Sequence, residues 1–452
     1  MDTVYEALSE IVGEEYVSNR QEELYIYSFD LGTTEPHCPQ YVVSPRTTED
    51  VQNIVKLANK EKVPVVPLGG GLSLAGLAVP FQGGIVLDLK RMDSIIEVNK
   101  QARYALVECG VSQGQLTSYL ERRYPGLTHS EPGAPPTATI AGNIAIHGQG
   151  DLGQPYGFSS DMVNGLEVVL PTGEVCRFGS CSIGAGWFTQ HPLPDVGLFL
   201  GWLGATGIIT KVSLRLFPRK KIRGVGQFIV EDEELVPEIM HKLTHLQMAE
   251  DIIAFSQAIP PLVSGLQNFT VNIAADSEKE LEFKQELIWD DTLGEYIRRG
   301  DGGFVGFVRG LQRPQVSTTS DWRKGGGFEY VGSIMPVEKY PECYRRGRKI
   351  SDSHGIPYTV LGRCIGAAHA MMFSWTYAFN RADAETMRHA REALHETDDL
   401  VLELGGTIWK PGLYGQRLLK ERLDPNTLAL MGKIKQMLDP NGIMNPGNWE
   451  VS

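Results

Sequence analysis

Three consecutive glycines are the feature of this sequence best suited to hold a ligand. Gly69-Gly70-Gly71 follows the strand-like stretch Val63–Pro67, and residues without a Cβ atom let backbone N–H groups approach a phosphate. The spacing is not GxGxxG, because Leu74 occupies the third glycine position, and no Gly-Lys-Ser/Thr follows as in a P-loop. Taken alone, this loop also fits an ordinary glycine-rich turn.

Further glycine-rich segments favour a ligand-binding role over an ordinary turn. Pro136–Asn143 runs into Gly148–Gly157, and Gly204–Thr210 follows later in the chain. All of these segments lie in a region of short strands, and their glycines leave the backbone accessible. Such a set suggests a long ligand that lies across one domain, and a dinucleotide such as FAD would fit.

Composition narrows the class of protein. The 452 residues carry a formal charge of −13, which argues against a general attraction to nucleic acid or to an anionic membrane. The six cysteines are scattered without CxxC spacing, so this chain alone should hold no zinc ribbon and no iron–sulfur cluster. The acidic N-terminus is unlike a signal peptide, and no apolar run approaches the roughly 18 residues of a membrane span. We expect a cytoplasmic globular protein.

The elements that would position the glycine loops follow from hydrophobic patterns. Thr47 and Asp50 have the spacing of a helix cap. One apolar helix face follows from Val51, Ile54, Val55 and Ala58. Strands are predicted at Gly84–Leu89, Ile95–Val98, Ala105–Glu108, Gly165–Leu170 and Ile208–Phe217.

The pattern changes after the basic run Arg219–Lys221, which we interpret as a solvated linker between domains. The region 221–400 then predicts a separate α+β unit. Helices are predicted at Asp232–Leu246, Arg381–Leu404 and Leu423–Leu438, and strand-like pieces at Trp322–Pro336 and Pro357–Val360. A strong turn, Asp439–Gly442, ends the last helix.

Five motifs in a fixed order carry a specific resemblance. They are the glycine loop from Pro67, Ile140-Ala-Gly-Asn, Tyr156-Gly, Gly207-Ile-Ile-Thr-Lys and Leu438-Asp-Pro-Asn-Gly-Ile-Met-Asn-Pro-Gly. Over nearly the whole chain they resemble the FAD-linked oxidases of the vanillyl-alcohol oxidase/p-cresol methylhydroxylase (PCMH) superfamily. The resemblance implies an α+β fold, with a PCMH-type FAD-binding domain of two subdomains and an antiparallel-sheet, ferredoxin-like cap domain. It implies an FAD domain over 1–220, a substrate or cap domain over 221–404, and a segment over 405–452 that returns to the FAD domain.

The resemblance also implies which residues hold FAD. Leu68–Leu74 would bind the pyrophosphate, Ile140–Asn143 and Gly148–Gly157 the flavin region, and Gly207–Ile209 the adenine side. Asn445 would lie close to the flavin ring. The expected cofactor residues are Pro67, Leu68, Gly69, Gly70, Gly71, Leu72, Ser73, Leu74, Pro132, Thr139, Ile140, Gly142, Asn143, His147, Gly150, Tyr156, Gly157, Gly207, Ile208, Ile209 and Asn445.

We expect the FAD to be bound without a covalent link. Leu72 stands where relatives with an 8α-histidyl flavin carry histidine, and a carbon side chain cannot form that bond. The His-His site in the cap of some relatives aligns with Met372-Phe373.

Two branches of the superfamily compete for the substrate. The N-terminal third resembles the D-2-hydroxy-acid dehydrogenases, which bind a divalent metal in the cap. Ala367, Ser374 and Pro411-Gly412 stand where those enzymes carry the ligands, so we expect no metal site. The hydroxy-acid chemistry would then have to proceed without a metal.

The middle of the chain resembles the 4-alkylphenol oxidisers, through Trp322–Gly327 and Asn380–Asp383. The Tyr-Arg pair of their phenolate clamp aligns near Trp409-Lys410, and their carboxylate after Tyr-Gly aligns with Phe158. Neither substrate class therefore transfers in full.

Polar groups expected near the flavin are the candidate catalytic residues. A cation there could bind a carboxylate or phenolate, and a histidine could take a hydroxyl proton as hydride leaves for flavin N5. A lone histidine is more often structural, and a lone cation is more often solvated. The candidates are His369, Lys410, Arg417, Tyr414 and Arg363, with His147 from the FAD domain. Met371–Tyr377 is interpreted as cap-domain core.

We therefore expect an FAD-dependent dehydrogenase or oxidase. It would remove hydride from a carbon that bears a hydroxyl, or from a benzylic carbon, of a small anionic or phenolic substrate. The alternative is the flavin subunit of an electron-transfer complex, with an iron–sulfur protein or an electron-transfer flavoprotein as partner. A non-catalytic flavin-binding scaffold is a third hypothesis, and a homo-oligomer is compatible with the sequence.

Overall fold

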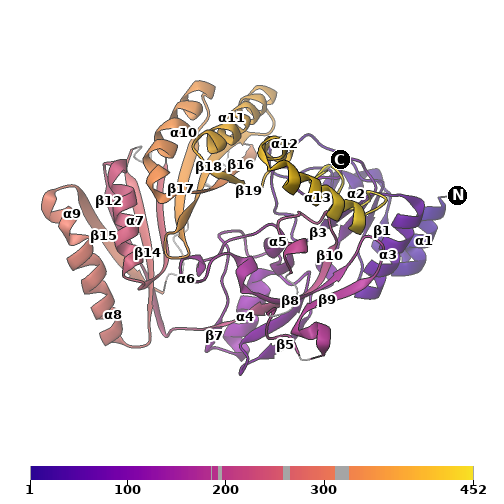
Figure 1. Ribbon diagram of the computed structural model, residues 1–452, viewed down its shortest axis with the longest axis horizontal. Helices are drawn as coiled ribbons and strands as arrows, with labels where there is room; N and C mark the ends of the chain where they lie inside the picture. Colours follow the sequence, from indigo (N-terminus) through magenta and orange to yellow (C-terminus); the bar gives the residue numbers. More distant parts are fainter. Residues whose placement is uncertain (1, 185, 192–195, 258–264, 311–324, 451–452) are drawn as a thin grey trace. The chain divides into compact units, whose positions relative to one another are not determined.

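In the computed structural model the described residues are 2–184, 186–191, 196–257, 265–310 and 325–450. They form two compact units (Figure 1). The first unit comprises Met1–Gln149, Ser159–Pro218 and Gln416–Ser452, and the second comprises Gly150–Phe158 and Arg219–Gly415. The assignment of an FAD domain to 1–220, a substrate domain to 221–404 and a returning segment to 405–452 stays a prediction.

The first unit contains two main sheets. The four-stranded sheet has the order β1-β2-β4-β3, with β4 parallel to both of its neighbours. The five-stranded sheet is antiparallel, in the order β5-β6-β10-β8-β9. Their strands are β1 (Val17–Ser18), β2 (Tyr41–Val43), β3 (Val65–Leu68), β4 (Ile85–Asp88), β5 (Ile95–Asn99), β6 (Tyr104–Glu108), β8 (Val163–Val169), β9 (Val175–Gly179) and β10 (Ile208–Arg215), and β7 (Leu127–Thr128) pairs with β11 (Phe217–Pro218). The helices are α1 (Thr3–Val12), α2 (Gln21–Ile26), α3 (Thr48–Glu61), α4 (Gln113–Arg123), α5 (Ile140–Ala145) and α13 (Pro425–Leu438).

Helix α3 shows how local sequence builds this unit. The Thr47 side chain accepts a hydrogen bond from the Asp50 N–H at 3.1 Å, and the Asp50 carboxylate accepts one from the Thr47 N–H at 3.0 Å. This is a capping box, which satisfies two backbone donors that a helix start leaves open. The four apolar residues predicted to form one face are all buried, so the prediction for this helix is confirmed.

The C-terminal segment returns to the parallel sheet. The Val65 N–H donates to the Ile443 carbonyl at 2.7 Å, and the Asn445 N–H donates to the Val65 carbonyl at 2.8 Å. Met444 thereby forms a parallel bridge with Val65, beside the free edge of β3. The motif predicted from the end of the sequence thus lies next to the strand that leads into the glycine loop.

The second unit is built on one antiparallel sheet of eight strands, in the order β15-β12-β14-β13-β17-β18-β16-β19. They are β12 (Ile222–Val230), β13 (Ala249–Gln257), β14 (Gln267–Ala275), β15 (Gly302–Arg309), β16 (Gly326–Met335), β17 (Tyr358–Ile365), β18 (Ala370–Asn380) and β19 (Thr407–Trp409). The helices are α6 (Gly153–Tyr156), α7 (Val236–His245), α8 (Glu278–Gln285), α9 (Gly294–Arg299), α10 (Tyr340–His354) and α11 (Ala384–Glu403), and α12 (Leu413–Arg422) runs on into the first unit. The first three residues of the predicted strand Trp322–Pro336 lie outside the described residues.

The two faces of this sheet differ. On β18 the side chains of Phe373, Trp375 and Tyr377 pack against helices; the Trp375 indole N–H, for example, donates to the Cys343 carbonyl of α10 at 3.0 Å. These residues are buried core, as predicted. Because side chains alternate along a strand, Thr376 and its cross-strand partner on β16 point to the opposite face.

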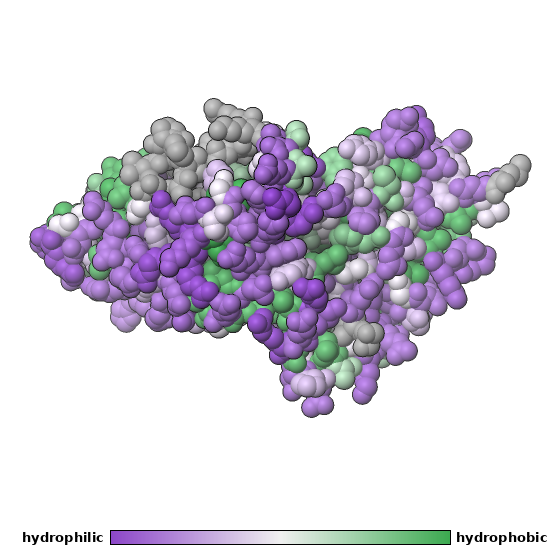
Figure 2. All heavy atoms as spheres, turned by 90° about the horizontal axis from the view of Figure 1, so that it is seen from above, coloured by the Kyte–Doolittle hydropathy of each residue, from purple (hydrophilic) through white to green (hydrophobic). Residues whose placement is uncertain are grey.

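Hydrophilic residues cover most of the face seen in Figure 2, with hydrophobic residues between them. No helix in the described part of the chain is both long enough and apolar enough to cross a membrane.

Candidate functional site

The glycine-rich segments of the first unit converge. A Cβ atom on Gly70 would lie 2.7 Å from the Thr137 carbonyl oxygen, so glycine is required where this loop meets the Pro136–Asn143 segment. A Cβ on Gly204 would lie 2.8 Å from Pro67 Cγ, which brings the third segment to the end of β3. Gly71 has a φ of 68°, and a Cβ there would meet nothing within 4 Å. The loop is thus packed on one side and open at its tip.

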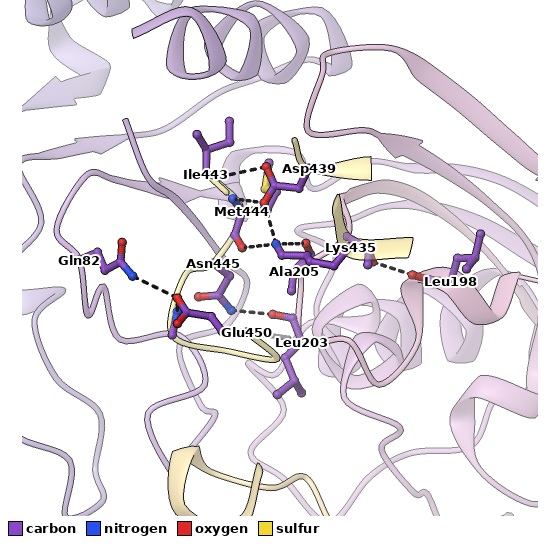
Figure 3. Close-up of polar contacts among 12 residues, drawn as sticks. Gln82, Leu198, Leu203, Ala205, Lys435, Asp439, Ile443, Met444, Asn445 and Glu450 are labelled. Atoms are coloured by element: carbon purple, nitrogen blue, oxygen red, sulfur yellow. Dashed lines mark hydrogen bonds and ion pairs between the residues drawn. The ribbon is translucent and has the colours of Figure 1, made fainter. Parts of the chain in front are cut away.

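Asn445 joins this convergence from the end of the chain (Figure 3). Its side chain is 1% exposed, and its Nδ2 donates to the carbonyl oxygens of Leu203 at 2.6 Å and Leu77 at 3.0 Å. Its Oδ1 is buried and accepts no hydrogen bond from the described residues. A buried acceptor in this state is costly unless a ligand supplies the donor.

A buried ion pair holds the turn that precedes Asn445. Lys435 Nζ lies 2.6 Å from Asp439 Oδ2 and also donates to the Ala205 and Met444 carbonyl oxygens, at 2.6 and 3.1 Å (Figure 3). The Asp439 carboxylate accepts from the backbone N–H groups of Ile443 and Met444, at 3.0 and 2.9 Å. The charge of Asp439 is therefore neutralised, and the conformation that presents Asn445 is fixed.

The other residues expected to bind FAD occupy several environments. Thr139 caps α5 by accepting from the Gly142 N–H, and Asn143 Nδ2 donates to Ser159 Oγ at 2.8 Å. Ile208 and Ile209 are buried on β10. The His147 ring lies 3.0 Å from Ser160 Oγ, and burial lowers the pKa of its imidazole. Gly150, Tyr156 and Gly157 lie in the segment 150–158, which belongs to the second unit.

The residues of the first unit fit a bound dinucleotide. Three glycine-rich segments and Asn445 meet there, the loop tip is open, and a buried amide oxygen awaits a donor. The donors and acceptors are mostly backbone groups and an amide, which suits pyrophosphate and an isoalloxazine edge.

Lys410 contacts two members of a group of aromatic rings in the second unit. Lys410 Nζ lies 3.9 Å from the centroid of the Trp409 ring and 3.4 Å from Tyr330 Oη, to which it donates. The Tyr330 and Trp409 rings lie 6.4 Å apart, and so do those of Phe158 and Trp409. Phe328 adds a fourth ring, 6.2 Å from Tyr330. We name these five residues the Lys410 cluster.

The position of the cluster follows from strand register. Tyr330 pairs with Thr376 and Gly332 pairs with Trp409, so both aromatic side chains lie on the face of the sheet opposite the helices. Lys410 follows β19 directly, with a φ of 57°, and its side chain is half-buried.

The surroundings of Lys410 do little to stabilise its positive charge. Among the described residues no carboxylate lies within ion-pair distance of its ammonium group, and burial lowers the pKa of Lys410 to about 7. Burial, followed by the charge of Glu329, raises the pKa of Tyr330 to about 12, so that phenol stays neutral. An anion placed beside Lys410 would supply the missing countercharge and stabilise the ammonium form.

The other candidate catalytic residues are engaged elsewhere. Arg363 forms a buried bidentate pair with Asp251, with Nε to Oδ1 at 2.7 Å and Nη2 to Oδ2 at 2.5 Å. His369 is exposed, and its Nδ1 lies 3.3 Å from the Gly366 carbonyl oxygen. The structure therefore does not bring these two side chains into the Lys410 cluster.

Tyr414 and Arg417 lie on α12 rather than on the sheet. The Tyr414 hydroxyl donates to Asp399 Oδ2 at 2.7 Å, and its ring stacks on that of His395 at 4.0 Å. The Arg417 side chain is 61% exposed and lies 4.0 Å from Glu421. Their predicted roles stay predictions, without a contact to Lys410.

Sequence reasoning missed Tyr330 as a member of the cluster. It is one of several aromatic residues in a strand, and only its pairing register shows that it faces Lys410. Within the part of the chain that the structure describes, no group of three His, Cys, Asp or Glu side chains could hold a metal ion.

Comparison with known proteins shows the class of protein to which this chain belongs. Residues 39–179 match the FAD binding domain, and residues 323–449 match the C-terminal domain of FAD linked oxidases. The chain is therefore an FAD-linked oxidoreductase with the α+β, PCMH-type fold that its motifs resemble, and FAD is its cofactor.

Individual relatives come from both expected branches. The glycolate oxidase subunit GlcD of Bacillus subtilis is 24% identical, over 98% of this chain and 96% of that protein. The 4-cresol dehydrogenase [hydroxylating] flavoprotein subunit of Pseudomonas putida is 26% identical, over 97% of this chain and 93% of that protein. The crystal structure of p-cresol methylhydroxylase with substrate bound has a TM-score of 0.86 at 21% identity, and the match covers 100% of this chain and 97% of that one.

Proposed function

We propose that this oxidoreductase removes hydride from a small anionic or phenolic substrate, and that the Lys410 cluster binds the anionic end. The carbon that loses hydride would bear a hydroxyl or lie next to an aromatic ring. FAD, when bound, supplies the hydride acceptor, and the hydroxyl proton leaves to a base or to water. The observation that carries the proposal is a half-buried lysine that has no carboxylate partner among the described residues and contacts two aromatic rings.

The cluster favours an aromatic substrate over an aliphatic one. Tyr330, Trp409 and Phe158 offer ring faces and edges that stabilise another ring by about 0.5–1.5 kcal/mol per pair beyond area burial. The Lys410 ammonium would then contact a phenolate or aryl carboxylate at the end of that ring. A short 2-hydroxy acid would use the cation but leave the aromatic surface uncovered.

The test is anaerobic bleaching of the bound flavin's visible absorbance. 4-Alkylphenols and 2-hydroxy acids are added in turn to wild type, to Lys410→Met and to the control Lys339→Met, which changes a partly exposed lysine of the same unit. Bleaching that is lost only in Lys410→Met would support the proposal. Bleaching that survives in Lys410→Met, or that neither class produces although flavin is present, would overturn it.

The alternative function is that of a flavin subunit that passes electrons to a partner protein. Two relatives are named as subunits, a glycolate oxidase subunit and a 4-cresol dehydrogenase flavoprotein subunit. No Cys or His cluster for a second redox centre occurs in the described residues, so electrons that oxygen does not take would need an external acceptor. A redox protein that co-purifies with the chain and is reduced on substrate addition would favour this function. We also propose a cytoplasmic location, which cell fractionation tests.

A further inference from the structure

The turn between β17 and β18 has an unusual backbone. Gly366, Ala367 and Ala368 are consecutive and have φ values of 52°, 58° and 64°. Left-handed conformations cost an alanine about 1–2 kcal/mol, and such residues persist only where the surroundings impose them. Two adjacent left-handed alanines therefore point to a constraint from outside the turn.

The constraint comes from the segment 150–158. The Ala367 N–H donates to the Gln154 carbonyl at 2.9 Å, and the Gly366 N–H donates to the Gly153 carbonyl at 3.3 Å. Gly153 and Gln154 are buried and form α6. The turn thus donates two backbone hydrogen bonds to the segment 150–158. This segment belongs to the second unit, although the residues before and after it belong to the first.

The same segment has one further contact with the sheet and one charge that acts on it. The Phe158 ring contacts that of Trp409, within the Lys410 cluster. Near the other end, Asp151 is buried. Burial lowers the pKa of Arg363, but Asp251, with a smaller contribution from the charge of Asp151, raises it overall. The segment is therefore held in its middle by two hydrogen bonds and at its C-terminal end by a ring contact.

We propose that the turn Gly366–His369 is a positioning element. It fixes the backbone of the segment 150–158, with Gly157 at its C-terminal end, relative to the Lys410 cluster. The inference rests on the proposed function, in which Lys410 holds the substrate, and on the expectation from the family resemblance that Gly148–Gly157 binds the flavin region. The turn then sets the alignment of the reacting atoms and leaves substrate affinity to Lys410.

Proline substitutions separate the hydrogen bond from the strain. Ala367→Pro removes the donor to Gln154, whereas the matched control Ala368→Pro introduces the same conflict with a positive φ at a residue whose N–H makes no such bond. Ala367→Gly keeps the donor and relieves the strain. Asp151→Asn removes the charge that acts on Arg363 without changing the turn, and it is the second variant if Ala367→Pro does not fold.

The measurements are the visible spectrum of the bound flavin, the limiting rate of its reduction and the apparent Kd, with 4-cresol or D-lactate as reductant. In Ala367→Pro we expect a reduction rate lower by roughly 10- to 100-fold and a changed flavin spectrum, with apparent Kd within about twofold of wild type. Ala367→Gly and Ala368→Pro should keep the wild-type rate within about threefold. Asp151→Asn should change rate and spectrum in the same direction as Ala367→Pro.

Two outcomes would overturn the inference. One is an equal loss of rate in Ala367→Pro and Ala368→Pro, because the turn would then matter only for folding. The other is an unchanged spectrum and rate in both Ala367→Pro and Asp151→Asn. A further variant, Gly157→Ala, places a side chain at a φ of 85°. It distinguishes failure of the positioning role from failure of the proposed flavin contact. If Gly157→Ala alters the flavin spectrum and the other two variants do not, only the positioning role falls. If none of the three does, the proposed flavin contact falls as well.

Discussion

The ammonium group of Lys410 lies over the ring of the preceding residue, Trp409, 3.9 Å from its centroid. Adjacent side chains in an extended strand point to opposite faces, so this contact requires the left-handed backbone of Lys410, with a φ of 57°. The cation–π contact partly replaces an ion pair, at about 0.5–2 kcal/mol. A lysine in this state is available to an incoming anion.

Anion binding should therefore depend on pH near neutrality. Burial lowers the pKa of Lys410 in the free enzyme to about 7, so its ammonium form is lost as pH rises through that value. The apparent Kd of a phenolate or carboxylate inhibitor, such as benzoate, should rise about tenfold per pH unit above pH 7. Lys410→Met should raise the Kd at pH 6 by roughly 10- to 100-fold and flatten the profile. Titration by flavin absorbance measures both, and a wild-type Kd that stays constant from pH 6 to pH 9 would contradict the role of Lys410.

The glycine loop should tolerate no side chain at Gly70. A Cβ there would lie 2.7 Å from the Thr137 carbonyl oxygen, so Gly70→Ala must displace the backbone of one of the two segments. We expect a loss of FAD affinity of at least tenfold, measured from the ratio of visible to ultraviolet absorbance after gel filtration. Gly126→Ala is the matched control, because a Cβ at Gly126 meets nothing within 4 Å. Full FAD retention in Gly70→Ala would show that the loop does not contact the cofactor.

The ion pair behind Asn445 should be strongly stabilising. Lys435→Met leaves the fully buried carboxylate of Asp439 without its cation, and breaking such a pair typically costs about 3–5 kcal/mol. We expect a lower midpoint of urea unfolding for the apoprotein and weaker FAD retention. Lys433→Met, at an exposed position on the same helix, should change neither. Equal stability of the Lys435 and Lys433 variants would contradict the assignment.

The flavin should leave the protein on acid precipitation. Leu72 cannot form an 8α-histidyl bond, so trichloroacetic acid should release all the yellow colour into the supernatant. A yellow, fluorescent pellet would instead reveal a covalent link through another residue. Mass spectrometry of the denatured chain would then show the mass of one added flavin.

Motifs with fixed spacing allowed the first unit to be predicted in some detail. The cap at Thr47 and Asp50 depends only on residues within one turn, and β3, β4 and β8 are short apolar runs between turns. The second unit was harder, because β18 is buried on both faces, and the alternation from Phe373 to Asn380 does not say which strands pair with it. Its antiparallel sheet was inferred from family resemblance rather than from pattern.

The candidate site could be predicted only where residues that act together are also neighbours in the sequence. Lys410 could be singled out because the family resemblance aligns a Tyr-Arg pair near Trp409-Lys410. Arg363 looked equally suitable in the sequence. In the fold, however, it forms an ion pair with Asp251, which lies 112 positions earlier in the chain. Such long-range pairing depends on strand register, which no local pattern in either segment specifies.

The bridge between Val65 and Met444 imposes an order on biosynthesis. The strand that leads into the glycine loop is made early, but residues 443–445, which cover its edge and bring the Asn445 amide, leave the ribosome hundreds of residues later. The Asn445 amide can therefore join the glycine loop only after residues 443–445 have been made. A chain that has not yet reached residue 445 would lack the Asn445 amide and would keep an open edge beside β3.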